Sequence, residues 1–347
     1  MELDSESKKL RVMIGGGTGY IGSALIPVLV EYGYDVSVID LNWFGNRLPE
    51  SVPVTKKNLI DCTVEDLEGY DQFIFLAGLS NDPMAEFSPS ANFIYNAALP
   101  AYLAYIAKKA GVKRYVCASS CSVYGYTVDK AYDEETPVVC HYPYGIAKLQ
   151  GEEGVVRMAD DDFSVVSLRQ GTVSGYSPRM RLDLVINAMF KSAMAQGKIT
   201  VNNPAIWRPI FDMRDVINAY VRAIQAHPSI SGVFNVASDN YTVGQLADIV
   251  KKEVEELTSQ KIGLEIRSIQ DFRNYKVRID RAREALGFQP QYAARDTVRD
   301  LYANLDKFSD FDNPQYYNIE TFKQIRIEDI KTDAMRFDPK MEDFKKP

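Results

Sequence analysis

The sequence has very little histidine and cysteine for its length. Its 347 residues include two histidines, His141 and His227. So few imidazoles leave little material for a histidine-rich metal site or for a catalytic triad that depends on histidine. The four cysteines form no C-x-x-C pair and are too few for a disulfide framework; they are Cys62, Cys117, Cys121 and Cys140. We therefore predict a reducing compartment and expect no metal site.

Long apolar runs and clusters of positive charge are also missing. No apolar run approaches the roughly 18 residues that a membrane span needs, and residues 1–10 lack the apolar core of a signal peptide. Because 40 Lys and Arg stand against 47 Asp and Glu, the net charge is −7, and no basic block offers a surface for nucleic-acid phosphates. We expect a cytoplasmic protein that binds neither membranes nor nucleic acid.

What the sequence does contain is the composition of a folded protein with a sizeable core. Apolar residues make up 46% of the chain and charged residues 25%, which argues against global disorder. At roughly 150 residues per domain, the length suits one large domain and a smaller one.

Short apolar strands alternate with helical stretches in the first half of the chain. An apolar run at 11–15 is followed by glycines, by a helical pattern up to Gly33 and by a β-branched run at 34–40. Further strands are predicted at 71–78, 113–120 and 163–171, and one of the helices between them at Asn92–Ala110. This alternation predicts a parallel sheet covered on both faces, which is a Rossmann-type, doubly wound α/β fold.

The second half has a different pattern, rich in helices. It predicts helices at 182–196, 216–226, 243–257 and 293–305 and a strand at 233–238. We predict a first domain over 10–175, to which parts of 205–240 return, and a smaller α/β domain mainly over 176–305. Residues 306–347 form a C-terminal extension with several aromatic residues and a tail.

The glycine turn after the first strand is typical of dinucleotide binding. Gly16, Gly19 and Gly22 form G-x-x-G-x-x-G between a strand and a helix, where the backbone must approach a pyrophosphate and helix amides favour the anion. Asp40 ends the next strand, 18 residues after Gly22, as expected for a carboxylate that binds the ribose hydroxyls. This acid would repel a 2′-phosphate, so the pattern predicts NAD rather than NADP.

A second constellation predicts the catalytic residues. Ser120 ends a strand, and Tyr144 and Lys148 follow at helical i, i+4 spacing, on one helix face. A phenol with a pKa near 10 is a poor base at neutral pH, but a nearby ammonium and a cationic nicotinamide stabilise its phenolate. We therefore predict that Tyr144 is the catalytic base, that Lys148 lowers its pKa and that Ser120 takes part in the proton shuttle.

Several motifs occur in the order that is typical of one enzyme family. They are GGGTGYIG (15–22), Asp40, FLAG (75–78), SSCSVYG (119–125), YPYGIAK (142–148), LRQGTVSG (168–175) and WRPIFDMRD (207–215). With them the chain resembles, over roughly residues 10–305, the extended short-chain dehydrogenase/reductase family, in its NAD-dependent nucleotide-sugar epimerase/dehydratase branch. The resemblance implies that the first domain holds NAD, that the second holds a nucleotide-diphosphate sugar, and that homodimers form through helices near 88–110 and 144–159.

The resemblance also implies roles for individual residues. The expected cofactor-binding residues are Gly16, Gly19, Tyr20, Ile21, Gly22, Asp40, Asn58, Leu59, Leu76, Ala77, Gly78, Tyr144 and Lys148. The expected substrate-binding residues are Ser80, Ser120, Ser122, Tyr144, Thr172, Asn187, Arg208 and Arg273. Arg278 competes with Arg273 for one phosphate-binding position before the segment 286–290.

The residues after Ser120 indicate which reaction to expect. A 4,6-dehydratase of this family has Asp-Glu there, whereas this chain has Cys121 and Ser122, closest to the 4-epimerases. Thr172 departs from the asparagine that the 4-epimerases usually have at its position. We predict an NAD-dependent nucleotide-sugar 4-epimerase, with a net 4-dehydrogenase or 4-keto reductase as the alternative. A 4,6-dehydratase and a non-catalytic NAD-sensing or scaffold protein are less favoured.

Overall fold

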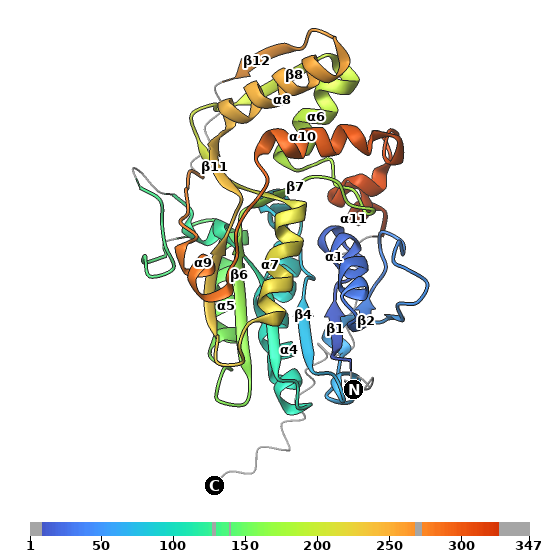
Figure 1. Ribbon diagram of the computed structural model, residues 1–347, viewed down its shortest axis with the longest axis vertical. Coiled ribbons are helices and arrows are strands. Elements are labelled where there is room, and N and C mark those ends of the chain that lie inside the picture. Colours follow the sequence, from blue (N-terminus) through green and yellow to red (C-terminus); the bar gives the residue numbers. More distant parts are fainter. Residues whose placement is uncertain (1–8, 127–129, 139, 268–272, 326–347) are drawn as a thin grey trace, which may run out of the picture.

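The main sheet is parallel throughout. A computed structural model describes residues 9–126, 130–138, 140–267 and 273–325. Its seven-stranded sheet has the order β10-β6-β5-β4-β1-β2-β3, in which every neighbouring pair is parallel (Figure 1). The strands are β1 Arg11–Gly15, β2 Asp35–Asp40, β3 Val54–Lys56, β4 Gln72–Phe75, β5 Arg114–Ser120, β6 Ser164–Gln170 and β10 Gly232–Val236. The predicted Rossmann-type fold is confirmed.

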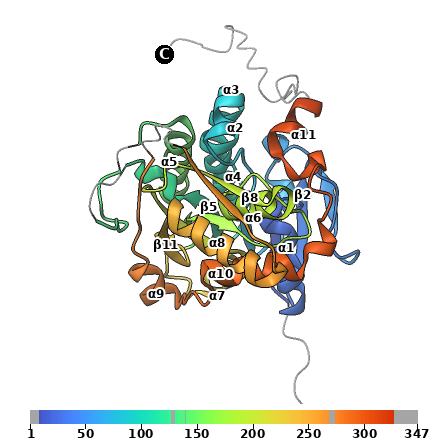
Figure 2. The same cartoon turned by 90° about the horizontal axis from the view of Figure 1, so that it is seen from above.

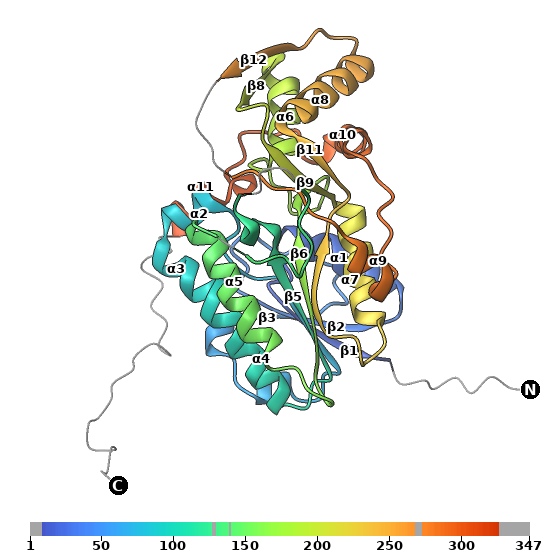
Figure 3. The same cartoon turned by 90° about the vertical axis from the view of Figure 1, so that its left-hand side faces the viewer.

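Helices cover both faces of this sheet because successive strand residues are apolar on both sides. Figure 3 shows α1 (Tyr20–Glu31) and α7 (Met213–Gln225) on one face and α4 (Leu99–Lys109) and α5 (Pro143–Val156) on the other. In β1, Val12 and Ile14 pack into the core beneath α1 and α7, whereas Met13 packs into the core beneath α4. Strands buried on both faces position their carboxyl ends rigidly at one edge of the sheet.

The second domain lies above that edge in Figure 1. It contains a two-stranded parallel sheet and a three-stranded sheet of order β11-β9-β7. Its elements are β7 Thr172–Ser174, α6 Val185–Gln196, β8 Lys198–Asn202, β9 Trp207–Asp212, β11 Asp239–Thr242, α8 Val243–Thr258, β12 Gly263–Arg267 and α10 Ala294–Ala303. From β9 the chain runs through α7 to β10, which pairs with β6, so part of 205–240 joins the first sheet. The helix α9 (Asp280–Leu286) packs beside β10.

The helix predicted over Asn92–Ala110 is present but contains a π-helical turn. After α2 (Asp82–Phe87), the chain forms α3 (Pro89–Phe93), a π-helical turn at Ile94–Ala98 and then α4. Pro100 offers no N–H to the carbonyl four residues earlier, which disfavours a regular α-helix across this point. The π-turn aims Asn96 at the chain after β4, where its amide donates to the carbonyl of Leu79 (2.7 Å). Such turns are frequent at functional sites.

The C-terminal extension packs onto the first domain. It includes 3₁₀ turns at Leu305–Lys307 and Pro314–Tyr316 and the helix α11 (Asn318–Ile325). Figure 2 shows α11 on the side of the molecule where β2 ends. The ring of Phe322 in α11 contacts Trp43 edge to face, with 5.3 Å between ring centroids. The predicted tail beyond residue 325 lies outside the described residues.

Two kinds of feature are absent from the described part of the chain. None of its helices combines the length and the apolar character that crossing a lipid bilayer requires. Its histidine, cysteine and carboxylate side chains form no group of three or more that suits a metal ion.

Candidate active site

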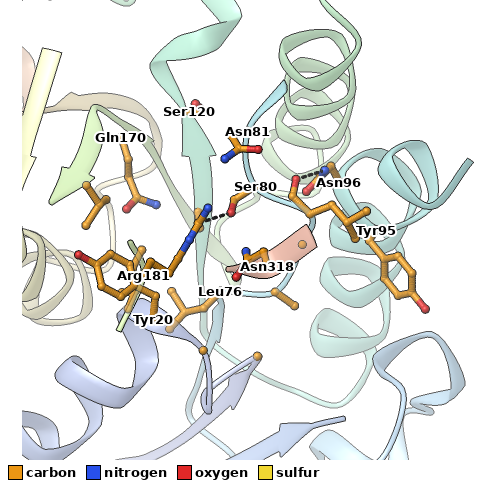
Figure 4. A pocket seen from close by; sticks show the side chains of 18 of the residues that line it. Tyr20, Leu76, Ser80, Asn81, Tyr95, Asn96, Ser120, Gln170, Arg181 and Asn318 are labelled. Atoms are coloured by element: carbon orange, nitrogen blue, oxygen red, sulfur yellow. Dashed lines mark hydrogen bonds between the residues drawn. The ribbon is translucent and has the colours of Figure 1, made fainter. Parts of the chain in front are cut away.

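One pocket lies at the carboxyl ends of the main strands and extends beneath the second domain. Every residue predicted to bind cofactor or substrate lines it except Asn187. In Figure 4, Ser80, Asn81 and Ser120 approach it from one side, and Tyr20, Arg181 and Gln170 from the other. The strand ends thus bring together residues from segments that are far apart in the sequence.

The glycine turn is shaped for a phosphate group. Gly16 has φ +84°, and a Cβ there would lie 2.5 Å from the backbone nitrogen of Ala77, so only glycine fits. Gly19 caps α1 without any side-chain hydrogen bond to the first amides, and the first turn of α1 contains no acidic residue. The α1 amides therefore stay available to an anion in the pocket.

Asp40 is held in place by the turn that it faces. Its Oδ2 accepts a hydrogen bond from the Thr18 amide (3.0 Å), and its Oδ1 accepts one from the Asn42 amide (2.7 Å). Each carboxylate oxygen keeps a further lone pair, so two hydroxyl donors from a ribose can still be accommodated. The turn and this carboxylate together fit a dinucleotide without a 2′-phosphate.

Ser120 receives two hydrogen bonds from its own turn. The amide and the hydroxyl of Ser122 both donate to Ser120 Oγ, at 3.1 and 2.9 Å. Both accepting positions of the Ser120 oxygen are thereby used, which leaves its own proton to donate into the pocket. Burial raises the pKa of Tyr144 to about 12, while its hydrogen bond with Ser120 and the nearby Arg181 act to lower that pKa.

Lys148 lines the pocket and is hydrogen-bonded to the main chain. Its ammonium donates to the carbonyl of Ala118 (2.6 Å), and burial lowers its pKa despite the nearby Cys117 and Glu152. The positive charge that lowers the pKa of Tyr144 in this structure is that of Arg181. The sequence analysis did not single out Arg181.

A buried ion pair between Glu152 and Arg169 connects the elements that carry Ser120 and Tyr144. Glu152 lies one helical turn after Lys148 and binds Arg169 of β6 with an Nη2–Oε1 distance of 2.6 Å. The same carboxylate accepts from the Ser119 hydroxyl (2.6 Å), and Arg169 donates to the Tyr124 hydroxyl (2.8 Å). These bonds fix β5, β6 and α5 relative to one another, which sets the relative positions of Ser120 and Tyr144.

The structure separates the two arginines that compete for the phosphate position. Arg273 lines the pocket, where its guanidinium pairs with Asp82 at 2.8 Å. Arg278 is exposed, pairs with Asp280 and does not line the pocket. Arg208 also lines the pocket and lies over the ring of Tyr275, 5.5 Å from its centroid.

The role predicted for Asn187 is wrong, because its side chain is used within the protein. Its oxygen accepts from the Gly175 amide (3.0 Å), and its amide donates to the Tyr20 hydroxyl and to the Arg181 carbonyl (3.0 and 2.8 Å). The side chain is fully buried. Asn187 therefore positions Tyr20 and the loop after Gly175 instead of touching a ligand.

Cys121 is not placed for catalysis. Its side chain is fully buried, its thiol lies 3.1 Å from the Arg169 carbonyl, and burial raises its pKa. A thiol in this environment stays protonated and does not face the pocket.

Further residues that line the pocket were not predicted from the sequence. Among them are Trp43, Phe44, Lys57, Asn96, Arg179, Arg181, Asn318 and Phe322. Asn92 and Asn96, spaced i, i+4 in an otherwise apolar stretch, and the arginine pair in the segment 179–181 were signals available in the sequence. The last two residues belong to the C-terminal extension, for which sequence periodicity predicts no site.

Comparison with known proteins places the chain in a family. The model of the NAD dependent epimerase/dehydratase family matches residues 12–237, which is more than half of the chain. The chain belongs to this family. Its members depend on NAD, and the glycine turn and Asp40 fit that cofactor, so the protein is an NAD-dependent enzyme of the epimerase/dehydratase family.

Individual members of the family differ in their reactions. A UDP-glucose 4-epimerase of Corynebacterium glutamicum is 24% identical over 320 residues, covering 85% of this chain and 95% of that protein. A UDP-glucuronic acid 4-epimerase from Bacillus cereus, solved with UDP-glucuronic acid and NAD, has 19% identity and a TM-score of 0.75 over 86% of this chain and 99% of its own. An NDP-hexosamine 5,6-dehydratase of tunicamycin biosynthesis has 20% identity and a TM-score of 0.73 over 87% and 98%. At these identities the solved structures establish the fold.

Proposed function

We propose that the protein is an NAD-dependent nucleotide-sugar 4-epimerase. The observation that carries this proposal is the composition of the Ser120 turn. The turn presents the hydroxyls of Ser120 and Ser122 to the pocket that Tyr144 lines, its thiol is buried away from the pocket, and it offers no carboxylate. Such a turn can move a proton on and off a sugar hydroxyl but supplies no acid of its own to expel water, and Asp82, a carboxylate elsewhere in the pocket lining, is paired with Arg273. The curated relatives named UDP-glucose 4-epimerase support the same reaction.

In this proposal Tyr144 and Ser120 handle the proton of the sugar C4 hydroxyl. The phenolic oxygen of Tyr144 takes the proton, and Ser120, whose own proton is free to donate, hydrogen-bonds the same sugar oxygen. Bound NAD supplies a hydride acceptor that later gives the hydride back. The phosphate turn, Asp40, Asn58 and the strand-end segment 76–78 would hold it. After the keto sugar has rotated in the pocket, return of the hydride to the other face of C4 and of the proton from Tyr144 to the oxygen would give the C4 epimer.

The substrate is proposed to bind through its diphosphate. Arg208 and Arg273 line the part of the pocket where the second domain contributes, and both guanidinium groups suit phosphate oxygens. Ser80, Ser122 and Thr172 line the pocket as well and are proposed to contact the substrate. UDP-sugars are the first choice for the nucleotide, because the relatives named above act on them.

The alternative is a net 4-dehydrogenase or 4-keto reductase, and the mass of the product separates the possibilities. The same proton transfer at Tyr144 serves both, but an epimerase keeps its cofactor. Incubating the protein with a panel of UDP-, GDP-, CDP- and dTDP-sugars should give a product of unchanged mass whose inverted C4 configuration is seen by NMR. A product lighter by two hydrogens would support a dehydrogenase, and a product lighter by one water would support a dehydratase.

We also propose a homodimer formed through α4 and α5. These helices lie side by side on one face of the sheet, and Tyr102 and Tyr105 of α4 are 40% and 49% exposed there. Aromatic side chains of this kind are enriched at interfaces. Sedimentation of the full-length chain should give twice the monomer mass, and replacing Tyr105 by Glu should shift it towards the monomer.

A further inference from the structure

The loop that follows β7 is tied directly to the phosphate turn. Ser177 Oγ donates to the Tyr20 carbonyl (2.7 Å), and the Tyr20 hydroxyl donates to the Gly175 carbonyl (2.6 Å). Asn187 donates to the same Tyr20 hydroxyl and to the Arg181 carbonyl (3.0 and 2.8 Å). Since Tyr20 is the first residue of α1, these bonds hold the loop 175–183 at the end of the helix where phosphate binds.

This loop brings two buried arginines to the pocket, and only one of them is neutralised. Arg181 forms a bidentate ion pair with Asp183 (2.9 and 2.8 Å). No carboxylate among the described residues pairs with Arg179, whose side chain is 2% exposed and whose Nε has no hydrogen-bond partner. A buried cation without a counter-ion is unfavourable unless a ligand supplies the anion.

The guanidinium of Arg179 is held in a fixed position. It stacks on the ring of Phe44, 3.6 Å from the centroid, and its Nη2 donates to Oδ1 of Asn318 in α11. Phe44 follows β2 four residues after Asp40, and Phe322 of α11 packs against Phe44 with 5.8 Å between ring centroids. The charge therefore lies between the chain segment after Asp40 and the C-terminal extension, in a pocket whose lining also includes the phosphate turn.

We propose that Arg179 binds the pyrophosphate of NAD and that Asn318 of the C-terminal extension positions it. A pyrophosphate brings two negative charges, and the α1 amides provide only partial positive charge. Arg208 lies in β9 and Arg273 in the segment before α9, and both line the pocket, so the substrate diphosphate has cations of its own. The C-terminal extension is then part of the cofactor site.

Calorimetric titration of the full-length chain with three probes tests this assignment. ADP-ribose carries the pyrophosphate, adenosine lacks it, and UDP carries the diphosphate of the substrate side. Arg179→Gln should weaken ADP-ribose binding about 10- to 100-fold, as expected for loss of a charged hydrogen bond, and leave the affinities for adenosine and UDP within about twofold.

The matched control is Arg47→Gln. Arg47 also joins the Phe44 segment to the extension, through the Phe44 carbonyl and Gln315 (2.6 and 2.8 Å), but does not line the pocket.

Three results would overturn the proposal. If adenosine and ADP-ribose weaken equally, Arg179 only supports packing. If UDP weakens and ADP-ribose does not, Arg179 serves the substrate. If ADP-ribose binds to Arg179→Gln as it does to the unaltered protein, the site needs no cation there.

A second variant tests the position of the charge without removing it. Asn318→Asp places a carboxylate on Arg179 and, at the first residue of α11, favours the helix. ADP-ribose binding should weaken about 5- to 20-fold through competition for the guanidinium, with no fall in the melting temperature. Unchanged affinity in a folded Asn318→Asp protein would contradict the proposal, even if Arg179→Gln fails to fold.

Discussion

The hydroxyl of Ser122 donates a 2.9 Å hydrogen bond to the hydroxyl oxygen of Ser120. The residue between these two serines, Cys121, is buried. Together with the Ser122 amide, this bond fills the acceptor positions of Ser120 and turns it into a donor towards the pocket. The pair explains how Ser122 can matter for the catalytic role proposed for Ser120 without touching the substrate's reacting carbon.

Loss of the Ser122 hydroxyl should therefore slow the reaction moderately. We expect Ser122→Ala to lower kcat about three- to tenfold with little change in KM, because the Ser122 amide still donates to Ser120. Ser120→Ala should cost more, about 10²- to 10⁴-fold in kcat, as for loss of a group that transfers a proton. Steady-state kinetics on both variants check this, with Ser192→Ala, at a half-buried serine that does not line the pocket, as the control. Equal losses of kcat in Ser122→Ala and Ser120→Ala would contradict these roles, in which Ser120 takes part in proton transfer and Ser122 only orients the Ser120 hydroxyl.

The pH dependence should follow the phenol of Tyr144. Burial raises its pKa to about 12, so the phenolate is the minor form at neutral pH and its fraction increases as the pH rises. If Tyr144 is the base, kcat/KM must rise with pH between 6 and 9, with the apparent pKa below 12 once the cationic nicotinamide is bound. Tyr144→Phe should lose this rising limb together with most of the activity. A kcat/KM that falls over this range would exclude Tyr144 as the base.

The Glu152–Arg169 pair should be important for stability. Glu152→Ala leaves the Arg169 cation buried without its bidentate partner, and we expect a loss of about 3–5 kcal/mol in the free energy of unfolding. The neighbouring Glu153 is exposed, and Glu153→Ala should change this free energy by less than about 0.5 kcal/mol. Urea unfolding followed by circular dichroism measures both. A loss near 1 kcal/mol or less for Glu152→Ala would show that the pair contributes little.

The fold and the centre of the site could be predicted because their signals are local. A tight strand–turn–helix connection needs Gly16 and Gly22 whatever the rest of the chain does, and helical spacing alone places Tyr144 and Lys148 on one face. Strand ends in a parallel sheet meet at one edge, which brings Ser120 to the same place as the glycine turn.

The remaining parts of the site depend on contacts that local sequence patterns do not encode. The C-terminal extension reaches the pocket through Asn318 and Phe322, which contact residues more than a hundred positions earlier. Sequence position alone also gives no direction for a side chain. Asn187 lies near the ligand site but points at backbone groups, and only the fold decides that Arg273 faces the pocket while Arg278 faces solvent.

The fate of the hydrogen at sugar C4 tests the proposed 4-epimerase activity most directly. A UDP-hexose labelled with deuterium at C4 would be incubated in ordinary water with the full-length protein and NAD, and the products would be analysed by NMR and mass spectrometry. We predict a C4 epimer that retains the deuterium, because the same hydride returns to the opposite face, and no such product from Tyr144→Phe. Absence of any C4 epimer across the sugar-nucleotide panel, or an epimer that has exchanged its label with water, would contradict the account.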